Sequence, residues 1–321
     1  MSDRETAGFL ATVPLFADLR EPERDELARV LRRRTVPPGE VLWRQGDDPR
    51  EMVLIADGAV SAGVQVTGGR ETEIGLSGRG EIVGLIGALD GHPHATTVRT
   101  TEATTVLALG RLDLAALLAG RQAAAFAVKR RLAQLLAERL RSQLDLLDRS
   151  LGGAAPPPQA ATVCEDLEQA RPPDSRYVRR MATFHAFDPL ALWGFLTSGS
   201  YHRCPPGRTL VAEGAPSTAY YLTINGAVEK VIVRADRRIR VGLAGPGKAF
   251  GYEGLIDGEP SAVTAITRER TLLLVVPAER FARLFAGEDA VSRGFLDVVQ
   301  NDLMAGLRES LRPAARLAAS G

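Results

Sequence analysis

The chain repeats itself at a fixed spacing, and this repeat constrains its fold more than any other feature. The Pro-Pro-Gly turn at 37–39 returns at 205–207, which is 168 positions later. Farther along, the spacing becomes 167, as in the pair Gly84 and Gly251. A constant offset between glycines that form turns indicates that one structural unit is present twice. Any account of function must therefore explain two copies.

Length and composition fit a globular protein of two domains. A chain of 321 residues accommodates two domains of about 150 residues each, which agrees with the offset. Its 45% hydrophobic and 25% charged residues are typical of folded soluble chains, and a net charge of +1 argues against a whole-chain polyanion binder. No apolar run is long enough to span a membrane and the N-terminus lacks a signal-peptide pattern, so we expect a cytoplasmic protein. The strong bias for arginine over lysine indicates a bacterial gene of high GC content. Cys164 and Cys204 are too few for a disulfide framework or a four-thiolate metal site.

The hydrophobic pattern predicts short strands between helices in each copy. Strands separated by glycine-containing turns at intervals of about eight to twelve residues are typical of β-barrels. The expected strands lie at 52–55, 59–66, 72–76, 95–100 and 104–109, and again at 220–224, 228–233, 239–243, 263–267 and 271–276. A short helical stretch opens each copy, and Arg32, Arg33 and Arg34 are interpreted as the solvated end of the first one. We therefore predict a mainly β fold with helices (α+β), consisting of two tandem β-barrels of the double-stranded β-helix (jelly-roll) type.

A long helix is expected to close each copy. Leucines at steps of three and four form one stripe over 121–151, and apolar residues form another over 291–311, up to Pro313. The stripes must be buried, either on the barrels, against each other or against a second chain. The predicted boundaries are a first domain at 8–151, a Pro/Ala-rich linker at 152–177, a second domain at 178–312 and a tail at 313–321.

The order of these features resembles the cyclic nucleotide-binding domain. A helix, a barrel opened by the Pro-Pro-Gly turn, a hairpin at Gly58 or Gly226, a glycine-rich segment and a long closing helix occur twice in the same order. This domain is the sensor module of Crp–Fnr regulators, of cAMP-dependent kinase regulatory subunits and of gated channels. The resemblance covers about 8–150 and 178–312. It implies a regulatory protein whose ligand is a cyclic nucleotide such as cAMP or cGMP.

In that family the ligand is bound by a phosphate-binding cassette, which is a short turn and helix between two strands. The cassette reads F-G-E-x-[AG]-L, followed a few residues later by R-[AS]-A. The glycine lets the backbone approach the phosphate, and N–H groups at the start of the helix donate to its oxygens. The glutamate accepts a hydrogen bond from the ribose 2′-hydroxyl, and the arginine pairs with the phosphate charge.

Both copies depart from this pattern at the charged positions. In the first copy, Leu85 stands at the glutamate position and His94 at the arginine position. In the second copy, Tyr252 stands at the glutamate position with Glu253 one residue later, and Pro260 stands at the arginine position. Loss of the arginine removes a charge-assisted hydrogen bond of about 1.5–3 kcal/mol. We therefore expect weak binding of cAMP, and weaker binding in the second copy than in the first.

The predicted ligand-binding residues follow from these positions. The first cassette would use Gly84, Leu85, Ile86, His94, Ala95 and Thr96. The second cassette would use Gly251, Tyr252, Glu253, Ser261 and Ala262. His94 is interpreted either as a phosphate contact that depends on pH or as a surface loop histidine. No catalytic residue and no metal site is predicted, because the chain has only four histidines and they are split between the copies.

Three classes of function are compatible with the sequence. The leading hypothesis is a regulatory sensor that binds a cyclic nucleotide or another small anionic ligand and passes closure of the terminal helix to a partner. The second is a ligand-free interaction scaffold, which contacts a protein partner or itself through the helices at 121–151 and 288–312. The third is a cupin-like enzyme, which the histidine count disfavours. We expect no enzyme activity, no membrane contact and no direct DNA binding, because no helix-turn-helix segment follows either copy.

Overall fold

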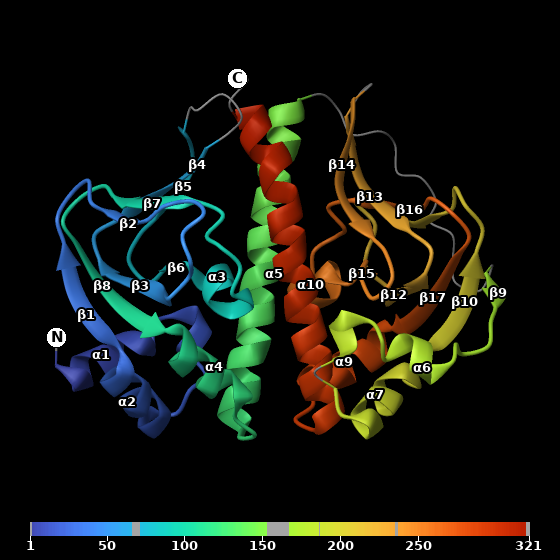
Figure 1. The fold of residues 1–321 in the computed structure, drawn as a ribbon, viewed down its shortest axis with the longest axis horizontal. Coiled ribbons are helices and arrows are strands. Elements are labelled where there is room, and N and C mark those ends of the chain that lie inside the picture. The colour runs from blue at the N-terminus through green and yellow to red at the C-terminus, as the bar shows by residue number, and fades with distance from the viewer. Residues whose placement is uncertain (1, 66–70, 153–166, 186, 235–236, 319–321) are drawn as a thin grey trace. The chain divides into compact units, whose positions relative to one another are not determined.

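The computed structural model describes residues 2–65, 71–152, 167–185, 187–234 and 237–318 (Figure 1). The chain divides into two units, Met1–Leu132 with Ala315–Gly321, and Ala133–Ala314. Each unit contains one β-barrel with its own helices.

The first unit begins with three short helical segments. Helix α1 (Asp3–Leu10) starts with a capping box, in which the Ser2 hydroxyl accepts from Glu5 N and the Glu5 carboxylate accepts from Ser2 N. The 3-10 helix η1 (Pro14–Phe16) and helix α2 (Glu21–Val30) follow. Both capping-box hydrogen bonds satisfy N–H groups that the first turn of a helix cannot pair internally.

Two four-stranded antiparallel sheets form the first barrel, in the orders β1-β8-β3-β6 and β2-β7-β4-β5. Alternate residues of the strands point inward, so that Val53, Ile55, Val106 and Ala108 pack with Trp43 in the barrel core. The strands are β1 (Arg32–Val36), β2 (Val41–Trp43), β3 (Glu51–Asp57), β4 (Val60–Gln65), β5 (Glu71–Ser77), β6 (Ile82–Val83), β7 (Thr97–Thr100) and β8 (Thr104–Gly110). The helices that follow are α3 (Leu85–Asp90), α4 (Arg111–Ala119) and α5 (Ala123–Leu151).

The second barrel has a five-stranded sheet in the order β15-β12-β17-β10-β9 and a four-stranded sheet in the order β11-β16-β13-β14. Its strands are β9 (Glu168–Gln169), β10 (Ser200–Cys204), β11 (Thr209–Val211), β12 (Ala219–Asn225), β13 (Val228–Arg234), β14 (Arg237–Ala244), β15 (Ala249–Phe250), β16 (Thr264–Thr267) and β17 (Thr271–Pro277). Its helices are α6 (Ser175–Val178), η3 (Ala182–Phe184), α7 (Pro189–Leu196), α8 (Glu253–Asp257), α9 (Ala278–Ala286) and α10 (Ala290–Ala318).

The repeat in the sequence is also present in the hydrogen bonds of the two barrels. Gly39 N donates to Thr100 O at 2.9 Å in the first barrel, and Gly207 N donates to Thr267 O at 2.8 Å in the second. Gly39 and Gly207 both have a φ angle of +79°, which glycine adopts without strain. The predicted fold class, α+β with two barrels in tandem, is confirmed.

Four local predictions differ from the structure. Arg32, Arg33 and Arg34 form strand β1 rather than the end of a helix, because the strand continues into the β-formers Thr35 and Val36 and pairs with β8. The helix expected from residue 121 begins at residue 123, after the separate helix α4. Helix α10 continues through a proline at 313 to residue 318. The segment predicted as a linker includes strand β9 and the start of α6, while 153–166 lie outside the described residues.

Within the second unit, the part of α5 that follows Leu132 lies beside α10 (Figure 1). Gln143 Nε2 donates to Leu307 O at 3.1 Å and to Ser310 Oγ at 3.0 Å. A Cβ atom on Gly306 would lie 3.3 Å from a methyl carbon of Leu140, so the absence of a side chain there allows close approach. The leucines of this stripe are buried, namely Leu140, Leu144, Leu147 and Leu151. The two predicted stripes therefore contact each other within one chain.

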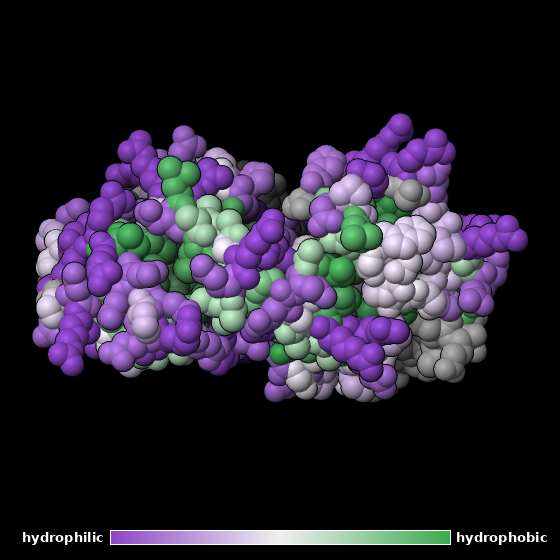
Figure 2. All heavy atoms as spheres, turned by 90° about the horizontal axis from the view of Figure 1, so that it is seen from below, coloured by the Kyte–Doolittle hydropathy of each residue, from purple (hydrophilic) through white to green (hydrophobic). Residues whose placement is uncertain are grey.

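The surface carries a mixture of polar and apolar side chains. Figure 2 shows one face on which hydrophilic residues predominate and apolar residues occupy separate areas between them. Exposed apolar side chains include Leu112, Leu190 and Trp193, which are 85%, 81% and 58% exposed. In the part of the chain that the structure describes, no helix is both long and apolar enough to cross a membrane.

Candidate functional site

Each predicted cassette is a glycine turn followed by a short helix, and in both the glycine is needed for the backbone itself. Gly84 has a φ angle of +74° and precedes α3, and Gly251 has a φ angle of +76° just before α8. A Cβ atom on Gly84 would lie 3.0 Å from the ring of Trp43 and 3.2 Å from Glu51 O. These glycines therefore have a structural role whether or not a ligand is bound.

The predicted residues of the first cassette have different environments. Leu85 is 1% exposed, so its side chain faces the protein interior, whereas Ile86, Ala95 and Thr96 are half-buried. His94 is 7% exposed, and its backbone is fixed on both sides. His94 N donates to the carbonyl oxygen of residue 47 at 2.9 Å, and the His94 carbonyl accepts from the N–H of residue 46 at 2.8 Å. His94 is therefore an ordered, buried residue rather than a surface loop histidine.

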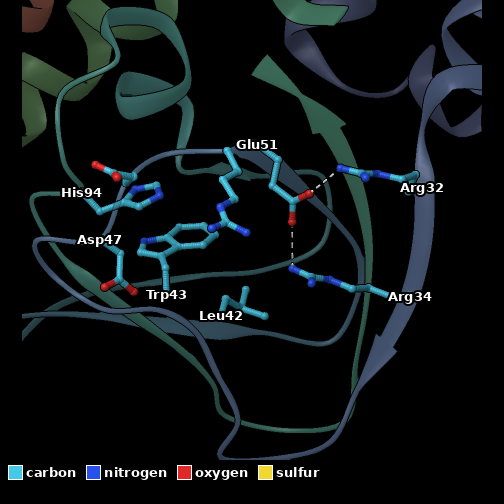
Figure 3. Close-up of a pocket in the computed structure, with 9 residues that line it drawn as sticks. Arg32, Arg34, Leu42, Trp43, Asp47, Glu51 and His94 are labelled. Carbon is cyan, nitrogen blue, oxygen red and sulfur yellow. Dashed lines mark hydrogen bonds and ion pairs between the residues drawn. The ribbon is translucent and has the colours of Figure 1, made fainter. Parts of the chain in front are cut away.

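His94 stacks on Trp43 at the edge of a pocket (Figure 3). The ring centroids are 4.5 Å apart and the planes are 14° from parallel. The pocket has a volume of about 570 Å³. Its lining consists of Arg32, Arg34, Leu42, Trp43, Asp47, Asp48, Arg50, Glu51 and His94. Of the predicted ligand residues of the first cassette, His94 lines this pocket, and the other five are not among its lining residues.

The charged rim of the pocket comes from strands β1 and β3. Arg32 and Arg34 each donate to the Glu51 carboxylate, at 2.9 and 3.0 Å, as the dashed lines in Figure 3 show. They reach across β8 at a point where its residues are small, because Arg32 lies opposite Ala108 and Glu51 lies opposite Gly110. Sequence reasoning missed this rim, since it assigned these arginines to a helix. The segment Arg32–Val36 has no alternation of apolar and polar residues, so no local signal in the sequence indicated this strand.

The second cassette places its tyrosine in the core. Tyr252 is 0% exposed, and its hydroxyl donates to Asp302 Oδ2 at 2.9 Å. Asp302, on α10, also accepts from Ala249 N at 3.2 Å. Burial, followed by the nearby negative charge of Asp302, raises the pKa of Tyr252 well above its usual value. The side chain at the family's glutamate position thus fastens the cassette to α10.

The hydrogen bonds correct the predicted register of the second cassette. Ser261 has the backbone environment of His94, because Ser261 N donates to Ala215 O at 2.9 Å and its carbonyl accepts from Gly214 N at 2.8 Å. Ser261, and not Pro260, is therefore the structural equivalent of His94. Ser261 is 7% exposed, and its hydroxyl donates to Val263 O at 2.9 Å. This position carries an imidazole in the first copy and a hydroxyl in the second.

The remaining predicted residues of the second cassette are half-buried or in the backbone turn. Glu253 begins α8 and is half-buried, as is Ala262. A Cβ atom on Gly251 would lie 2.8 Å from Val211 Cγ2 and 3.1 Å from the Tyr221 ring. The cassette glycine of the second copy is therefore as tightly enclosed as that of the first.

Arg141 of α5 ties that helix to the second cassette. Its Nε donates to Asp257 Oδ2 at 2.7 Å and its Nη2 donates to Oδ1 at 3.1 Å, which makes a bidentate pair. Its Nη1 donates to Pro260 O at 2.8 Å. The side chains of Arg141 and Asp257 are 21% and 9% exposed, so solvent screens this pair less than a surface ion pair.

A second arginine, Arg234, also joins α5 to the barrel of this unit. Its Nη2 donates to Glu213 Oε1 at 2.5 Å, and its Nε pairs with Asp148 of α5. The hydrogen bond that Arg234 donates to Glu213, and then its bond to Asp148, raise the pKa of Arg234, although burial opposes this. Both clusters fix α5 to the second barrel through charge-assisted bonds.

No metal centre can be built from the part of the chain that the structure describes. Among those residues, no three His, Cys, Asp or Glu side chains lie close enough together to hold one ion. The His92-Pro93-His94 segment separates its two histidines, because His92 pairs with Asp90 at 3.5 Å while His94 stacks on Trp43.

Comparison with known proteins identifies the repeated unit. The family model described as "Cyclic nucleotide-binding domain" matches residues 33–121 and 201–288, together more than half of the chain. The "Cyclic AMP receptor protein" of Thermus thermophilus is 36% identical over 42% of this chain and 62% of that protein. A "cAMP-dependent protein kinase regulatory subunit" of Emericella nidulans is 32% identical over 32% of this chain and 24% of that protein. Among solved structures, the regulatory domain of Toxoplasma gondii PKA with cAMP matches 89% of this chain and 93% of that chain, at 18% identity and a TM-score of 0.36.

The matches to these two curated relatives span less than two thirds of each relative's length. The two segments that the family model matches each contain one complete Pro-Pro-Gly turn and one cassette glycine of the repeat. The chain therefore belongs to the cyclic nucleotide-binding domain family and carries two of its regulatory domains in tandem.

Proposed function

We propose that the chain is a regulatory protein whose first domain binds a cyclic nucleotide or another small anionic ligand and whose long helices pass this event to a protein partner. The observation that carries the proposal is the pocket of about 570 Å³ beside His94. Sites for small molecules have volumes of about 300–1,000 Å³. The family supplies the ligand class. The strong bias for arginine over lysine supports a bacterial origin, and we propose a cytoplasmic setting.

The first cassette offers backbone donors and an imidazole to an anion. The N–H groups of Leu85 and Ile86 follow Gly84 at the start of α3, where helices favour negative charge. His94 provides the side chain closest in position to the family's arginine. Because Leu85 is buried and apolar, it cannot accept a hydrogen bond from a ribose hydroxyl. The affinity for cAMP should therefore be lower than that of a cassette with both family residues.

A second candidate function, a ligand-free scaffold, is favoured for the second domain by a specific contact. Asp302 of α10 accepts hydrogen bonds from Tyr252 and from Ala249 N, so the protein itself already provides the contacts that close this cassette against the helix. The second domain would then act as a fixed platform. The first domain would be the only one that responds to ligand.

A thermal-shift screen with a matched pair of variants tests this assignment. Ala95 and Ala262 are 167 positions apart, are both half-buried and occupy equivalent places in the two cassettes. A glutamate at either place would repel a bound phosphate. A ligand at a hundredfold excess over its Kd raises the free energy of unfolding by about 2.7 kcal/mol, which such a screen detects.

We expect a shift with a cyclic nucleotide in the unmodified protein and in Ala262→Glu, and no shift in Ala95→Glu. A shift that persists in Ala95→Glu and disappears in Ala262→Glu would assign ligand binding to the second domain and would contradict the proposal. No shift with cAMP, cGMP, cyclic dinucleotides or linear nucleotides would leave the scaffold function for both domains.

A further inference from the structure

The two copies differ at one sheet edge. In the second copy, strand β10 has a neighbour on each side, because it pairs with β17 and also with the short strand β9. In the first copy, the equivalent strand β1 pairs with β8 and is the outermost strand of its sheet among the described residues. Among the described residues, the same edge is therefore covered by a strand in one copy and not in the other.

The covered edge shows what kind of segment fits there. Strand β9 runs antiparallel to β10, with Gln169 opposite His202 and Glu168 opposite Arg203. One residue farther along, Ala170 N donates a hydrogen bond of 2.7 Å to Tyr201 O, which extends the β-ladder. An ion pair of 3.1 Å between Arg203 Nη1 and Glu168 Oε1 adds a charge contact. The occupant is thus an extended segment that carries a carboxylate.

The open edge has the complementary properties. Arg33 is equivalent to Tyr201, 168 positions apart, so its N–H and C=O groups point away from β8 as those of Tyr201 point toward β9. Arg32, Arg33, Arg34 and Thr35 are all exposed. Arg32 and Arg34 pair with Glu51 of β3. Arg33 is therefore the arginine whose positive charge this edge offers to a partner.

We propose that the outer edge of β1 is a docking site for an extended acidic peptide segment of a partner protein, which adds a strand to the first barrel. Main-chain hydrogen bonds to Arg33 and Thr35 would fix the register of the added strand. The Arg33 side chain would select a carboxylate, which should lie opposite Arg33, at the place that Ala170 takes beside Tyr201. This proposal does not depend on ligand binding in either cassette.

The alternative is that the arginines only protect an open edge against aggregation, as charged residues on edge strands commonly do. A direct binding experiment separates the two. The probe is a fluorescent peptide with the sequence of residues 165–172 in which Ala170 is replaced by Glu, so that an acidic residue faces Arg33. Its binding to the full chain is measured by fluorescence anisotropy, and hydrogen exchange locates the protected amides.

Three protein variants sharpen the test. Arg33→Pro removes the outward N–H and blocks strand addition, yet it leaves the bonds of the neighbouring residues to β8 intact. Arg33→Glu reverses the local charge and keeps the backbone donor, and it covers the case in which Arg33→Pro fails to fold. Arg29→Glu makes the same charge change at an exposed position of α2, outside the strand.

We expect binding to be lost in Arg33→Pro, weakened about tenfold in Arg33→Glu and changed less than about twofold in Arg29→Glu. A peptide with lysines in place of its glutamates should bind about tenfold more weakly than the probe. Hydrogen exchange should slow at residues 32–36. Absence of binding, or equal binding by Arg33→Pro in its folded form, would overturn the proposal. A protein that dimerises alone and becomes monomeric in Arg33→Pro would assign the edge to a second copy of this chain and would also overturn it.

Discussion

At the scale of single residues, the two cassettes differ most at the position where the family has glutamate. Leu85 fills the interior of the first domain, while Tyr252 fills the core of the second and bonds to Asp302. The ring of Tyr252 also lies 5.2 Å from that of Tyr220, which is equally buried. Tyr252 thus packs in the hydrophobic core with its ring and holds α10 with its hydroxyl group.

Removal of the Tyr252 hydroxyl should destabilise the protein. Tyr252→Phe leaves Asp302 Oδ2 without its donor at a buried position, which costs about 1–3 kcal/mol of unfolding free energy. Urea denaturation measures the change. Tyr177→Phe is the matched control, because Tyr177 is 45% exposed and its hydroxyl makes a contact of 3.4 Å only; we expect less than about 0.5 kcal/mol there. Equal losses in the two variants would contradict this role for Tyr252.

Alkaline pH should lower the stability of the protein through the buried residues Tyr252 and Tyr220. Burial raises the pKa of both Tyr252 and Tyr220, so the folded state keeps these protons at a pH where the unfolded chain has lost them. The contribution of these two tyrosines to the free energy of unfolding is fully present below about pH 10, and it decreases as the pH rises above this value. Melting temperatures measured between about pH 9 and pH 12 should fall more steeply for the unmodified protein than for Tyr252→Phe. Parallel curves would show that Tyr252 does not contribute.

At the scale of elements, α5 is the feature that links the cassette of the second domain to the rest of its unit. Arg141 holds the end of α8 and the loop after it, while Asp148 joins the cluster of Arg234. One helix thus contacts both a cassette and a barrel strand. Movement of α5 must break or carry these contacts.

Loss of Arg141 should loosen the second cassette locally. In Arg141→Ala the Asp257 carboxylate loses a bidentate partner, so hydrogen exchange at residues 253–260 should become faster by about tenfold. Arg149→Ala on the same helix is the control, since Arg149 is exposed and bonds to a backbone oxygen of its own helix. Equal exchange rates at 253–260 in Arg141→Ala and in the unmodified protein would refute the link.

The contact between α5 and α10 should be sensitive to size at one glycine. Gly306→Leu would place a side chain where a Cβ atom already comes within 3.3 Å of Leu140, and we expect a loss of about 1–3 kcal/mol. Gly306→Ala should be close to neutral, because its better helix propensity of about 1 kcal/mol offsets the tight contact. Thermal unfolding measures both. A neutral Gly306→Leu would show that the helices do not approach closely here.

Elements with a strong local pattern could be predicted from the sequence, and those defined by pairing could not. Strands β3, β12 and β17 have continuous apolar runs between glycine or turn residues, and they lie where the pattern indicated. Strand β1 reads as three arginines in a row, and its pairing with β8 is a long-range contact that no local pattern reports. Strand β9 has two residues and depends wholly on β10.

The candidate site was predictable in position but not in orientation. The repeat and the cassette glycines located both turns, since glycine adopts their positive φ angles without strain. Whether the side chain at the next position faces a ligand or the core depends on tertiary packing, as Tyr252 and its partner Asp302, fifty residues later, show. The stack of Trp43 on His94 joins residues from β2 and from the segment before β7, which the sequence does not place together.

At the scale of the whole molecule, the chain contains one regulatory module twice, and the copies have diverged in complementary ways. The first copy has a pocket of about 570 Å³ beside its cassette, and within the described part of the chain no further strand covers the outer edge of β1, which carries Arg33. The second has a cassette bonded to α10 and to α5, and its equivalent edge is covered by β9. This divergence supports a division of labour between a responsive domain and a fixed one.

The stoichiometry of cyclic nucleotide binding tests this division most directly. Isothermal titration of the full chain with cAMP and with cGMP measures how many molecules bind per chain. We predict one bound nucleotide, whose binding is abolished by Ala95→Glu and unchanged by Ala262→Glu. Two bound molecules per chain, or one that is lost in Ala262→Glu and retained in Ala95→Glu, would contradict the account.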